Sequence, residues 1–450
     1  GGEMQKINIS KSIGSGLIGA LYILDEPTLG LHSKDTNQLI EILYELKKLG
    51  NSIIIVEHDK EVIKAADYII DIGPFAGLYG GEIIYNGPVN NKNITNSLTL
   101  NYVHNKMQIK YKLDSKNLIN FIEIYSAYAN NLKNIDVKIP MHAITAITGL
   151  SGSGKTSLLK EVLLPGIKRK LKDYSFDMPK CEKIHIDITE IENIEFLNQN
   201  SIKKSSKSTP ITYLGVFDDI RNLFASQKLA KIYQLSTKYF SFNVPGGRCE
   251  NCKGQGQVIV EMQFLSDIQL ECEICAGKRY QAKILQIYFN KKNIYDILNF
   301  TIQEAYEFFM NYNEAKIASQ LQPLMTVGLS YLKLGQSIAT LSSGEIQRLK
   351  LGSFLGKKNE KSILMFDEPT KGLHFHDIQI LINAFEELIK IGNTIIVIEH
   401  NLDVIKNVDW IIELGPESGF NGGSIVFAGT PTNLRHTKTH TSIALQNEIN

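Results

Sequence analysis

The stretch from Ala143 to Leu159, AITAITGLSGSGKTSLL, limits what this chain can fold into more than any other. It fits the pattern G-x-x-x-x-G-K-[ST], in which backbone N–H groups and a helix N-terminus surround a phosphate group. The residues that fit are Gly149, Gly154, Lys155 and Thr156. A β-type run, residues 143–148, precedes the loop, and a helix-forming run, residues 157–162, follows it. This order predicts an α/β fold with a phosphate-binding loop.

The loop predicts a site for a nucleoside triphosphate, ATP, with Mg²⁺. Lys155 can reach the outer phosphates, and the Thr156 hydroxyl can hold Mg²⁺. The expected phosphate contacts are Gly149, Leu150, Ser151, Gly152, Ser153, Gly154, Lys155, Thr156 and Ser157. The alternative is a Gly/Ser-rich turn that matches by chance, and the strand and helix around the loop argue against it.

Composition sets weaker bounds. The 450 residues are 43% hydrophobic and 21% charged, which indicates a soluble globular chain of roughly two to four domains. The net charge of +1 means that any nucleic-acid contact must come from local patches. No apolar run approaches the length of a membrane span, so no membrane partner is expected. The five cysteines are too few for a disulfide scaffold and have metal-type spacing, which indicates a reducing compartment, the cytoplasm.

An internal repeat organises the chain into two homologous copies. YILDEPT around Asp25 returns as LMFDEPT around Asp367, 342 residues later. GNSIIIVEHD from Gly50 returns as GNTIIVIEHN from Gly392 at the same offset, and Gly80-Gly81 returns as Gly422-Gly423. A constant offset predicts two halves rather than a short-period solenoid.

Each copy carries the acidic part of an ATPase site. An apolar strand-type run, Ile363 to Phe366, ends in Asp367-Glu368. Asp367 is suited to bind Mg²⁺ through water, and Glu368 to orient or deprotonate the attacking water. A second strand, Thr394 to Ile398, ends in Glu399-His400, and the imidazole can contact the γ-phosphate. The corresponding residues of the first copy are Asp25, Glu26 and His58.

Residues 341–348, LSSGEIQR, resemble the LSGGQ-type signature of the ATP-binding cassette (ABC) superfamily. Its expected γ-phosphate contacts are Ser342, Ser343, Gly344 and Glu345. In ABC proteins this signature completes the site of the opposite cassette. Ser343 replaces the usual glycine, and the added Cβ weakens the expected clamp. The repeat offset aligns Gly1-Gly2-Glu3 with Ser343-Gly344-Glu345, so the chain is expected to start inside the first signature.

The cysteines predict a closed zinc site. Two C-x-x-C pairs, Cys249/Cys252 and Cys272/Cys275, are separated by nineteen residues and flanked by glycine-containing turns. The residues between the pairs partly alternate, which predicts a β-hairpin. A redox motif needs one pair only, and disulfides suit a cytosolic ATPase poorly. The fifth cysteine, Cys181, is expected to be an ordinary thiol.

Together these motifs resemble the UvrA family, the DNA-damage-recognition subunits of the bacterial UvrABC excinuclease. The matching segments are GLSGSGKTSL (149–158), YFSFNVPGGRCENCKGQG (239–256), EMQFLSD (261–267), CEICAGKRY (272–280), LSSGEIQR (341–348), FDEPTKGLHFHD (366–377) and VIEHNLDVIKNVDWI (397–411). The resemblance covers nearly the whole chain and matches the family's C-terminal half with the end of its first cassette. ABC proteins in general lack the Cys₄ module.

The resemblance implies two ABC cassettes with composite ATP sites, homodimerisation, binding of damaged double-stranded DNA, and delivery of UvrB in nucleotide excision repair. It makes Gln199 a catalytic-site residue, although Asn198 departs from the family's Asp. Lys204 and Lys207 replace arginines in a segment expected to contact DNA phosphates, and a solvated loop is the alternative there. The UvrB site is expected in the family's N-terminal half.

The expected domains follow the chain. Residues 1–100 are the end of the first cassette, 101–118 a linker, 119–435 the second cassette, and 436–450 a polar tail. An insert, 160–340, contains the zinc module, 246–280. The phosphate loop and signature, Lys155 and Ser342, are 187 residues apart, farther than a compact transporter ATPase needs.

Two other functions remain open at this stage. An ABC transporter motor would lack the cysteines and need membrane partners. A UvrA-like protein in drug self-resistance, or in another non-repair DNA-binding role, would share every motif. Because the first phosphate loop is absent from these residues, this chain is expected to bind ATP at Lys155, to hydrolyse it slowly, and to expose apolar surface on the first cassette.

Overall fold

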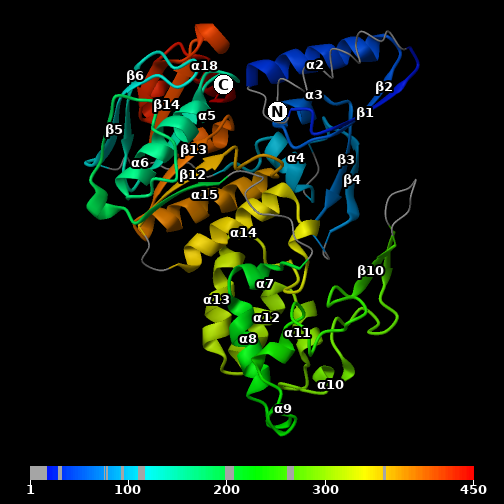
Figure 1. Cartoon of the computed structure of the whole chain (residues 1–450). Helices are drawn as coiled ribbons and strands as arrows, with labels where there is room; N and C mark the ends of the chain where they lie inside the picture. The colour runs from blue at the N-terminus through cyan, green and yellow to red at the C-terminus, as the bar shows by residue number, and fades with distance from the viewer. Residues whose placement is uncertain are drawn as a thin grey trace. The chain divides into compact units, whose positions relative to one another are not determined.

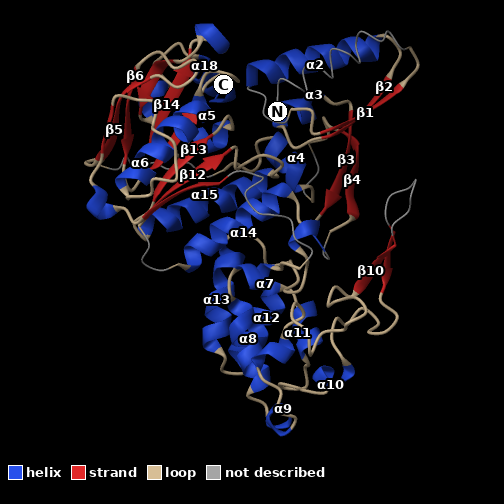
Figure 2. Ribbon diagram, in the orientation of Figure 1, coloured by secondary structure: helices blue, strands red, loops and turns tan. Residues whose placement is uncertain are grey.

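The computed structural model describes residues 18–28, 33–74, 77, 80–92, 96–109, 117–197, 207–260, 268–357 and 361–449. The chain divides into two compact units, residues 1–201 with 357–450, and residues 202–356. Each unit is described by itself, and Figures 1 and 2 label its elements. No helix in the described ranges is both long and apolar enough to cross a membrane.

A six-stranded sheet forms the centre of the first unit, in the order β15-β14-β7-β13-β12-β9. The strands are β7 (Ile144–Thr148), β9 (Asn193–Leu197), β12 (Ser362–Asp367), β13 (Thr394–Ile398), β14 (Trp410–Gly415) and β15 (Ser424–Gly429). All pairings are parallel except β14 with β15. Strands β7 and β13 are buried along their whole length, as expected for apolar runs covered on both faces.

A smaller antiparallel sheet, β6-β5-β8, shares the core of this unit. Its strands are β5 (Phe121–Ala127), β6 (Ile135–Pro140) and β8 (Lys183–His185). The chain leaves the phosphate loop through α5 (Lys155–Ser157), a π-helical turn η2 (Leu158–Leu163) and α6 (Leu164–Lys170). Fully buried Leu158, Leu159, Val162 and Leu163 pack between the sheets, so the loop is anchored at both ends.

The first repeat copy has the same local pairing as the second. Strands β1 (Leu21–Asp25) and β2 (Ser52–Val56) are parallel, with Asp25 opposite Val56. In the second copy Asp367 lies opposite Ile398, so both partners keep the 342-residue offset. Strands β3 (Tyr68–Gly73) and β4 (Glu82–Pro88) form a separate antiparallel pair.

The first copy leaves apolar side chains exposed where the second copy buries them. Ile23 and Ile54 are 69% and 53% exposed, whereas their counterparts Met365 and Ile396 are 0% exposed. In the second copy β7 lies between β13 and β14, but β2 and β3 belong to different two-stranded sheets. The predicted exposed apolar surface on the first copy is therefore confirmed.

Helices and helical turns complete the first unit. They are α2 (Ser33–Lys48), α3 (Lys60–Ala65), α4 (Leu98–Val103), η3 (Ile188–Glu190), α15 (Phe375–Lys390), α16 (Leu402–Ile405), η6 (Gly419–Asn421), α17 (Pro431–Leu434) and α18 (His440–Ile449). Helix α18 forms within the stretch that the sequence analysis described only as a polar tail. Its Leu445 is 1% exposed, which ties this end of the chain to the core.

The second unit is mostly helical and carries a β-hairpin. Its helical elements are α7 (Pro210–Tyr213), α8 (Val216–Ala225), α9 (Lys228–Ile232), η4 (Thr237–Phe240), α10 (Ala282–Leu285), α11 (Ile294–Asn299), α12 (Ile302–Asn311), α13 (Ala315–Thr326), η5 (Ile338–Thr340) and α14 (Ser343–Gly356). Strands β10 (Gln257–Val260) and β11 (Ile268–Glu271) pair antiparallel, which confirms the predicted hairpin. Residues 261–267, between these strands, lie outside the described ranges.

Candidate nucleotide and metal sites

The phosphate loop has the backbone that its glycines require. Gly149, Gly152 and Gly154 have φ values of 125°, 77° and 105°, which side-chain-bearing residues rarely adopt. A Cβ on Gly149 would lie 2.0 Å from the backbone oxygen of Leu414, in the neighbouring strand. The close approach of β14 therefore excludes any side chain at the first position of the loop.

Lys155 lies inside the loop and is 7% exposed. Its Nζ donates hydrogen bonds to the backbone oxygens of Gly149 and Leu150, each at 2.8 Å. The ammonium group is thus held among the backbone groups where a phosphate would be bound.

Two segments that the sequence analysis did not assign support the loop from outside. The Asn131 side chain donates to the Gly152 and Gly419 oxygens, each at 3.0 Å. The Gly419 N–H donates to the Gly152 oxygen at 3.1 Å, and the Ser418 hydroxyl donates to the Ser151 oxygen at 2.5 Å. These bonds hold loop carbonyls away from the phosphate side. The only sequence signal was the repeated Gly-Gly pair that follows the turn.

The acidic pair lies at the carboxyl end of β12. Glu368 has a φ of 48°, and its Oε1 lies 4.0 Å from Nε2 of His400, which follows β13. Lys371 Nζ lies 3.6 Å from the other Glu368 oxygen. Burial, together with the neighbouring Glu368, raises the pKa of Asp367, and Lys160 and Lys155 oppose that shift. The structure therefore brings Asp367, Glu368 and His400 together at one sheet edge.

The first copy repeats this geometry. Glu26 has a φ of 42°, and its Oε1 lies 4.0 Å from Nε2 of His58. The backbone N–H groups of Glu26 and Glu368 each donate to the neighbouring strand at 2.9 Å. Two equivalent carboxylate–imidazole pairs are thus present in the first unit.

Glu399 is a structural residue of the site that sequence reasoning left without a role. It is 2% exposed, and one carboxylate oxygen accepts the Thr370 N–H at 2.8 Å and the Thr370 hydroxyl at 2.7 Å. The other oxygen accepts the N–H groups of His400 and Asn401 at 3.0 and 3.2 Å. Burial raises its pKa to about 6. Glu399 therefore joins the turn after β12 to the turn after β13.

The first copy builds the same joint with Glu57. Its carboxylate accepts the Thr28 N–H at 2.8 Å, the Thr28 hydroxyl, and the N–H groups of His58 and Asp59 at 2.8 and 3.1 Å. One sequence signal for this joint was available: Thr28 and Glu57 return as Thr370 and Glu399 at the 342-residue offset. Sequence spacing alone does not show that they meet.

We expect Glu399→Gln to destabilise the first unit by about 1–3 kcal/mol, because the amide NH₂ cannot accept the His400 and Asn401 N–H groups. ATP turnover should fall with it, since His400 loses its fixed position. Thermal unfolding and steady-state ATPase assays at neutral pH measure the two effects. Glu57→Gln is the matched comparison: it should destabilise the unit to a similar degree but lower turnover at the Lys155 site less than Glu399→Gln does, because Glu57 accepts the N–H groups of His58 and Asp59 rather than that of His400. Equal loss of turnover in both variants would contradict this role of Glu399.

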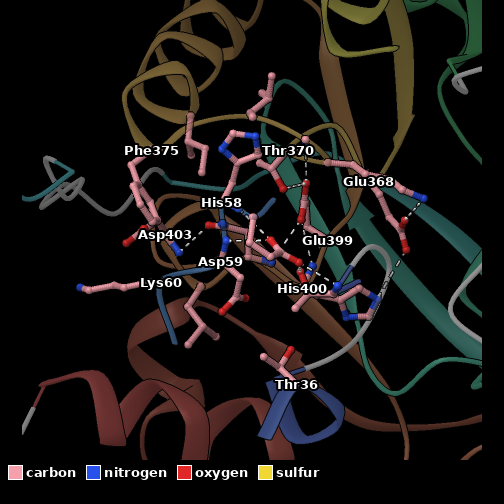
Figure 3. A pocket seen from close by; sticks show the side chains of 18 of the residues that line it. Thr36, His58, Asp59, Lys60, Glu368, Thr370, Phe375, Glu399, His400 and Asp403 are labelled. Atoms are coloured by element: carbon pink, nitrogen blue, oxygen red, sulfur yellow. Dashed lines mark hydrogen bonds and ion pairs between the residues drawn. The ribbon is translucent and has the colours of Figure 1, made fainter. Parts of the chain in front are cut away.

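A cavity of about 200 Å³ lies between the two copies in the first unit. Glu26 and His58 line it from the first copy, and Glu368, Glu399 and His400 from the second. Figure 3 shows side chains from both copies around this space. The two acidic sites are therefore neighbours within one unit.

The predicted signature and DNA-contacting residues belong to the second unit or fall outside the described ranges. Ser342 directly precedes helix α14 of the second unit and Glu345 lies in its first turn. The Ser342 N–H donates to Glu345 Oε2 at 2.7 Å, and the Glu345 N–H donates to Ser342 Oγ at 3.2 Å. Gln199, Lys204 and residues 1–3 lie outside the described ranges, and so does the side chain of Ser343. Gly344 is buried within α14, and Lys207 is exposed.

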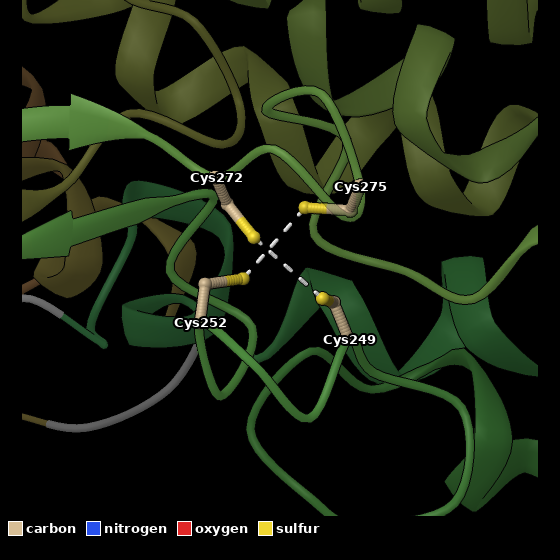
Figure 4. Close-up of side chains that lie close together, drawn as sticks. All are labelled: Cys249, Cys252, Cys272 and Cys275. Atoms are coloured by element: carbon tan, nitrogen blue, oxygen red, sulfur yellow. Dashed lines mark hydrogen bonds between the residues drawn. The ribbon is translucent and has the colours of Figure 1, made fainter.

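The four predicted cysteines converge in the second unit. Their sulfur atoms all lie within 4.8 Å of one another, and all four side chains are buried (Figure 4). The distances are 3.9 Å from Cys249 Sγ to Cys272 Sγ and 3.7 Å from Cys252 Sγ to Cys275 Sγ. A tetrahedral zinc ion with Zn–S bonds of about 2.3 Å requires sulfur separations near ~3.8 Å.

Hydrogen-bond donors favour thiolates in this cluster. The Asn251 side chain donates to Cys272 Sγ at 3.3 Å and lowers the pKa of Cys272 to about 6. The Gly256 N–H donates to Cys252 Sγ at 3.3 Å. Burial raises the pKa of Cys275 to about 12, so four clustered sulfurs need a cation to be charged together. The residues present fit a metal site, and none of the five cysteines forms a disulfide.

The strand order and the positions of the site residues are those of an ATPase. A phosphate loop after β7, an Asp-Glu pair at the end of β12 and a histidine after β13 make this an ABC-type ATPase fold with an inserted Cys₄ module. The archaeal ribosome recycling factor aABCE1, solved with the stalk protein aP1, matches 96% of this chain and 64% of its own at a TM-score of 0.50 and 17% identity. That likeness concerns the fold alone.

Relatives with higher identity define the family. UvrABC system protein A of Clostridium acetobutylicum is 48% identical over 434 residues, covering 96% of this chain and 46% of that protein. The Helicobacter pylori J99 protein is 45% identical over 455 aligned positions, covering 100% and 48%. The crystal structure of UvrA2 from Deinococcus radiodurans gives a TM-score of 0.91 at 38% identity, covering 99% of this chain and 54% of that one. No protein-family model matches.

The chain therefore belongs to the UvrABC system protein A family, which confirms the resemblance seen in the sequence. It spans about half the length of the relatives it matches.

Proposed function

We propose that this chain acts in nucleotide excision repair as a UvrA-like ATPase that recognises damaged DNA. The observation that carries the proposal is 45–48% identity to UvrABC system protein A along essentially the whole chain. The phosphate loop, the acidic pair and the cysteine cluster, each with geometry suited to its role, support it.

At the nucleotide site, backbone N–H groups of the loop and Lys155 bind the phosphates of ATP. Thr156 and Asp367 would hold Mg²⁺, which neutralises phosphate charge when bound. Glu368 accepts a proton from the water that attacks the γ-phosphorus, and ADP and inorganic phosphate result. His400, 4.0 Å from Glu368, contacts the γ-phosphate and fixes the direction of that carboxylate. Gln199 and the signature Ser342–Glu345 complete such sites in the family.

The remaining cofactor and partners follow from the same homology. Cys249, Cys252, Cys272 and Cys275 would hold one structural Zn²⁺. Damaged double-stranded DNA, UvrB and a second copy of the protein are the proposed partners, in the cytoplasm. Lesions would be recognised through duplex deformability rather than base-edge hydrogen bonds.

Fluorescence anisotropy with a duplex that carries one bulky adduct, beside the undamaged duplex, tests DNA recognition. The damaged duplex should bind more tightly in the presence of ATP, and Lys155→Ala should remove the effect of ATP. Equal binding of both duplexes under all conditions would contradict the proposal. Restored UV survival of a repair-deficient strain by the full-length gene would separate repair from self-resistance.

A further inference from the structure

The turn that follows Glu368 contacts the first repeat copy. Gly372 in this turn has a φ of 69°, and a Cβ there would lie 3.2 Å from Glu26 Oε1. The backbone of the turn after Glu368 thus lies directly against Glu26, the equivalent carboxylate of the first copy.

His374 ends this turn and caps helix α15. Its Nδ1 accepts the His376 N–H at 3.3 Å, so the ring proton of the neutral imidazole is on Nε2. Nε2 lies 3.0 Å from the Thr99 hydroxyl of α4 and donates to it. The Thr99 hydroxyl donates to Asp71 Oδ1 at 2.9 Å. One chain of hydrogen bonds therefore runs from α15 to β3 of the first copy.

Aromatic rings enclose this chain of bonds. The His374 ring centroid lies 6.5 Å from that of His58 and 6.3 Å from that of Tyr102, both in edge-to-face geometry. Tyr102 also packs 5.6 Å from Phe375. Thr99 and Tyr102 are each 8% exposed, so the contact excludes most water.

The hydrogen bond between Asp71 and Thr99 is not a chance contact, because the second copy contains an equivalent bond. Glu413 and Thr441 stand 342 residues after Asp71 and Thr99. Glu413 Oε1 accepts the Thr441 hydroxyl at 2.8 Å and the Thr441 N–H at 3.1 Å. The counterpart of His374 is His32, which lies outside the described residues.

We propose that His374 is a positioning residue, which through Thr99 and Asp71 clasps the turn after Glu368 to the first copy and so fixes Glu368 and Glu26 relative to each other. We call the hydrogen bonds that join Asp71, Thr99 and His374 the clasp. Its catalytic consequence rests on the proposed function, because it assumes that Glu368 orients the attacking water. The clasp makes the state of the first copy a determinant of turnover at the second.

The clasp requires a neutral imidazole, since Nδ1 must accept a hydrogen bond. The titratable groups that face it are Asp71 of β3, His58 after β2, Tyr102 of α4, and His376 and Asp377 of α15. Burial lowers the pKa of His374, and the two aspartates oppose that shift. The unfolded chain therefore binds this proton more readily than the folded one, so the stability that the neutral ring provides is present above about pH 6.5 and lost as pH falls.

Substitutions of Thr99 and His374 test the clasp in this chain. Thr99→Val removes the hydroxyl at equal size, and Thr99→Ser keeps it as the matched control. In His374→Asn the side chain can still accept the His376 N–H but is too short to reach Thr99. Thr99→Val and His374→Asn should each lower kcat for ATP about tenfold or more, with KM little changed. Thr99→Ser should stay near the parent, and the double variant should be no slower than either single one.

Two results would overturn the proposal: parental kcat in both single variants, or equal loss in Thr99→Ser and Thr99→Val. Thermal unfolding between about pH 8 and pH 5 gives a readout that needs no hydrolysis. The parent should lose more stability over this range than His374→Asn, and equal losses would also overturn the clasp. If the parent turns over no faster than Lys155→Ala, the proposed ATPase function fails, and the unfolding result alone decides the clasp.

Discussion

Glu368→Gln is expected to keep ATP binding and to lower turnover by a factor of roughly 10²–10⁴. The amide still forms hydrogen bonds near His400, but it cannot accept a proton from water. Its loss of charge removes the ion pair with Lys371, at 3.6 Å in the parent, without altering the phosphate loop. Equilibrium nucleotide binding and steady-state ATPase assays separate the two effects.

Lys155→Ala is the complementary variant, and it should lose ATP binding itself. The ammonium group is the cation held inside the loop by the Gly149 and Leu150 oxygens, and the phosphates would lose that charge. Glu26→Gln makes the same chemical change as Glu368→Gln at the equivalent position of the first copy, and is the comparison variant for it. Parental turnover in Glu368→Gln would show that another group activates the water.

Replacement of Cys252 and Cys275 by serine is expected to release about one metal ion per chain, because a structural site of this type is closed by four ligands. Structural zinc supplies on the order of 10 kcal/mol to folding of such modules. The β10–β11 hairpin should therefore become sensitive to protease. ATP binding should persist, since the phosphate loop belongs to the first unit. Elemental analysis, limited proteolysis and nucleotide binding measure these three outcomes.

Cys181→Ser is the control for the metal experiment. Cys181 is a half-buried free thiol outside the cluster, and its replacement should leave the metal content unchanged. Protein purified without chelator that contains no zinc would contradict the metal assignment.

The repeat explains why the clasp and the two Glu–His pairs occur together. Equivalent strands keep the same register in both copies, so equivalent turns present the same groups. Residues of the equivalent turns of both copies line one cavity, so the turns lie close together in the first unit. A change in the first copy therefore has a direct structural route to Glu368, through the turn that contains Gly372 and His374.

Features whose residues lie close together along the chain, or recur at a constant offset, were predictable from the order of the amino acids. The phosphate loop needs glycines at fixed positions, because the backbone there adopts φ values from 77° to 125°, and local spacing reveals that requirement. The cysteine pairs and their hairpin are local in the same sense. Strand β12, which ends at Asp367, and strand β13, which precedes His400, were recognisable because buried parallel strands are continuous apolar runs.

Contacts between residues that are far apart along the chain became visible only in the folded structure. Thr99 and His374 are 275 residues apart, and Asn131 and Gly419 are 288 residues apart. Threonine, asparagine and glutamate are common surface residues, so their identity does not indicate a buried contact until the fold brings them together. The burial of strand side chains also depends on the tertiary structure. Ile23 and Met365 stand at equivalent positions of equivalent strands, yet Ile23 is 69% exposed and Met365 is 0% exposed. The difference arises because apolar side chains are buried only where neighbouring strands and helices cover them.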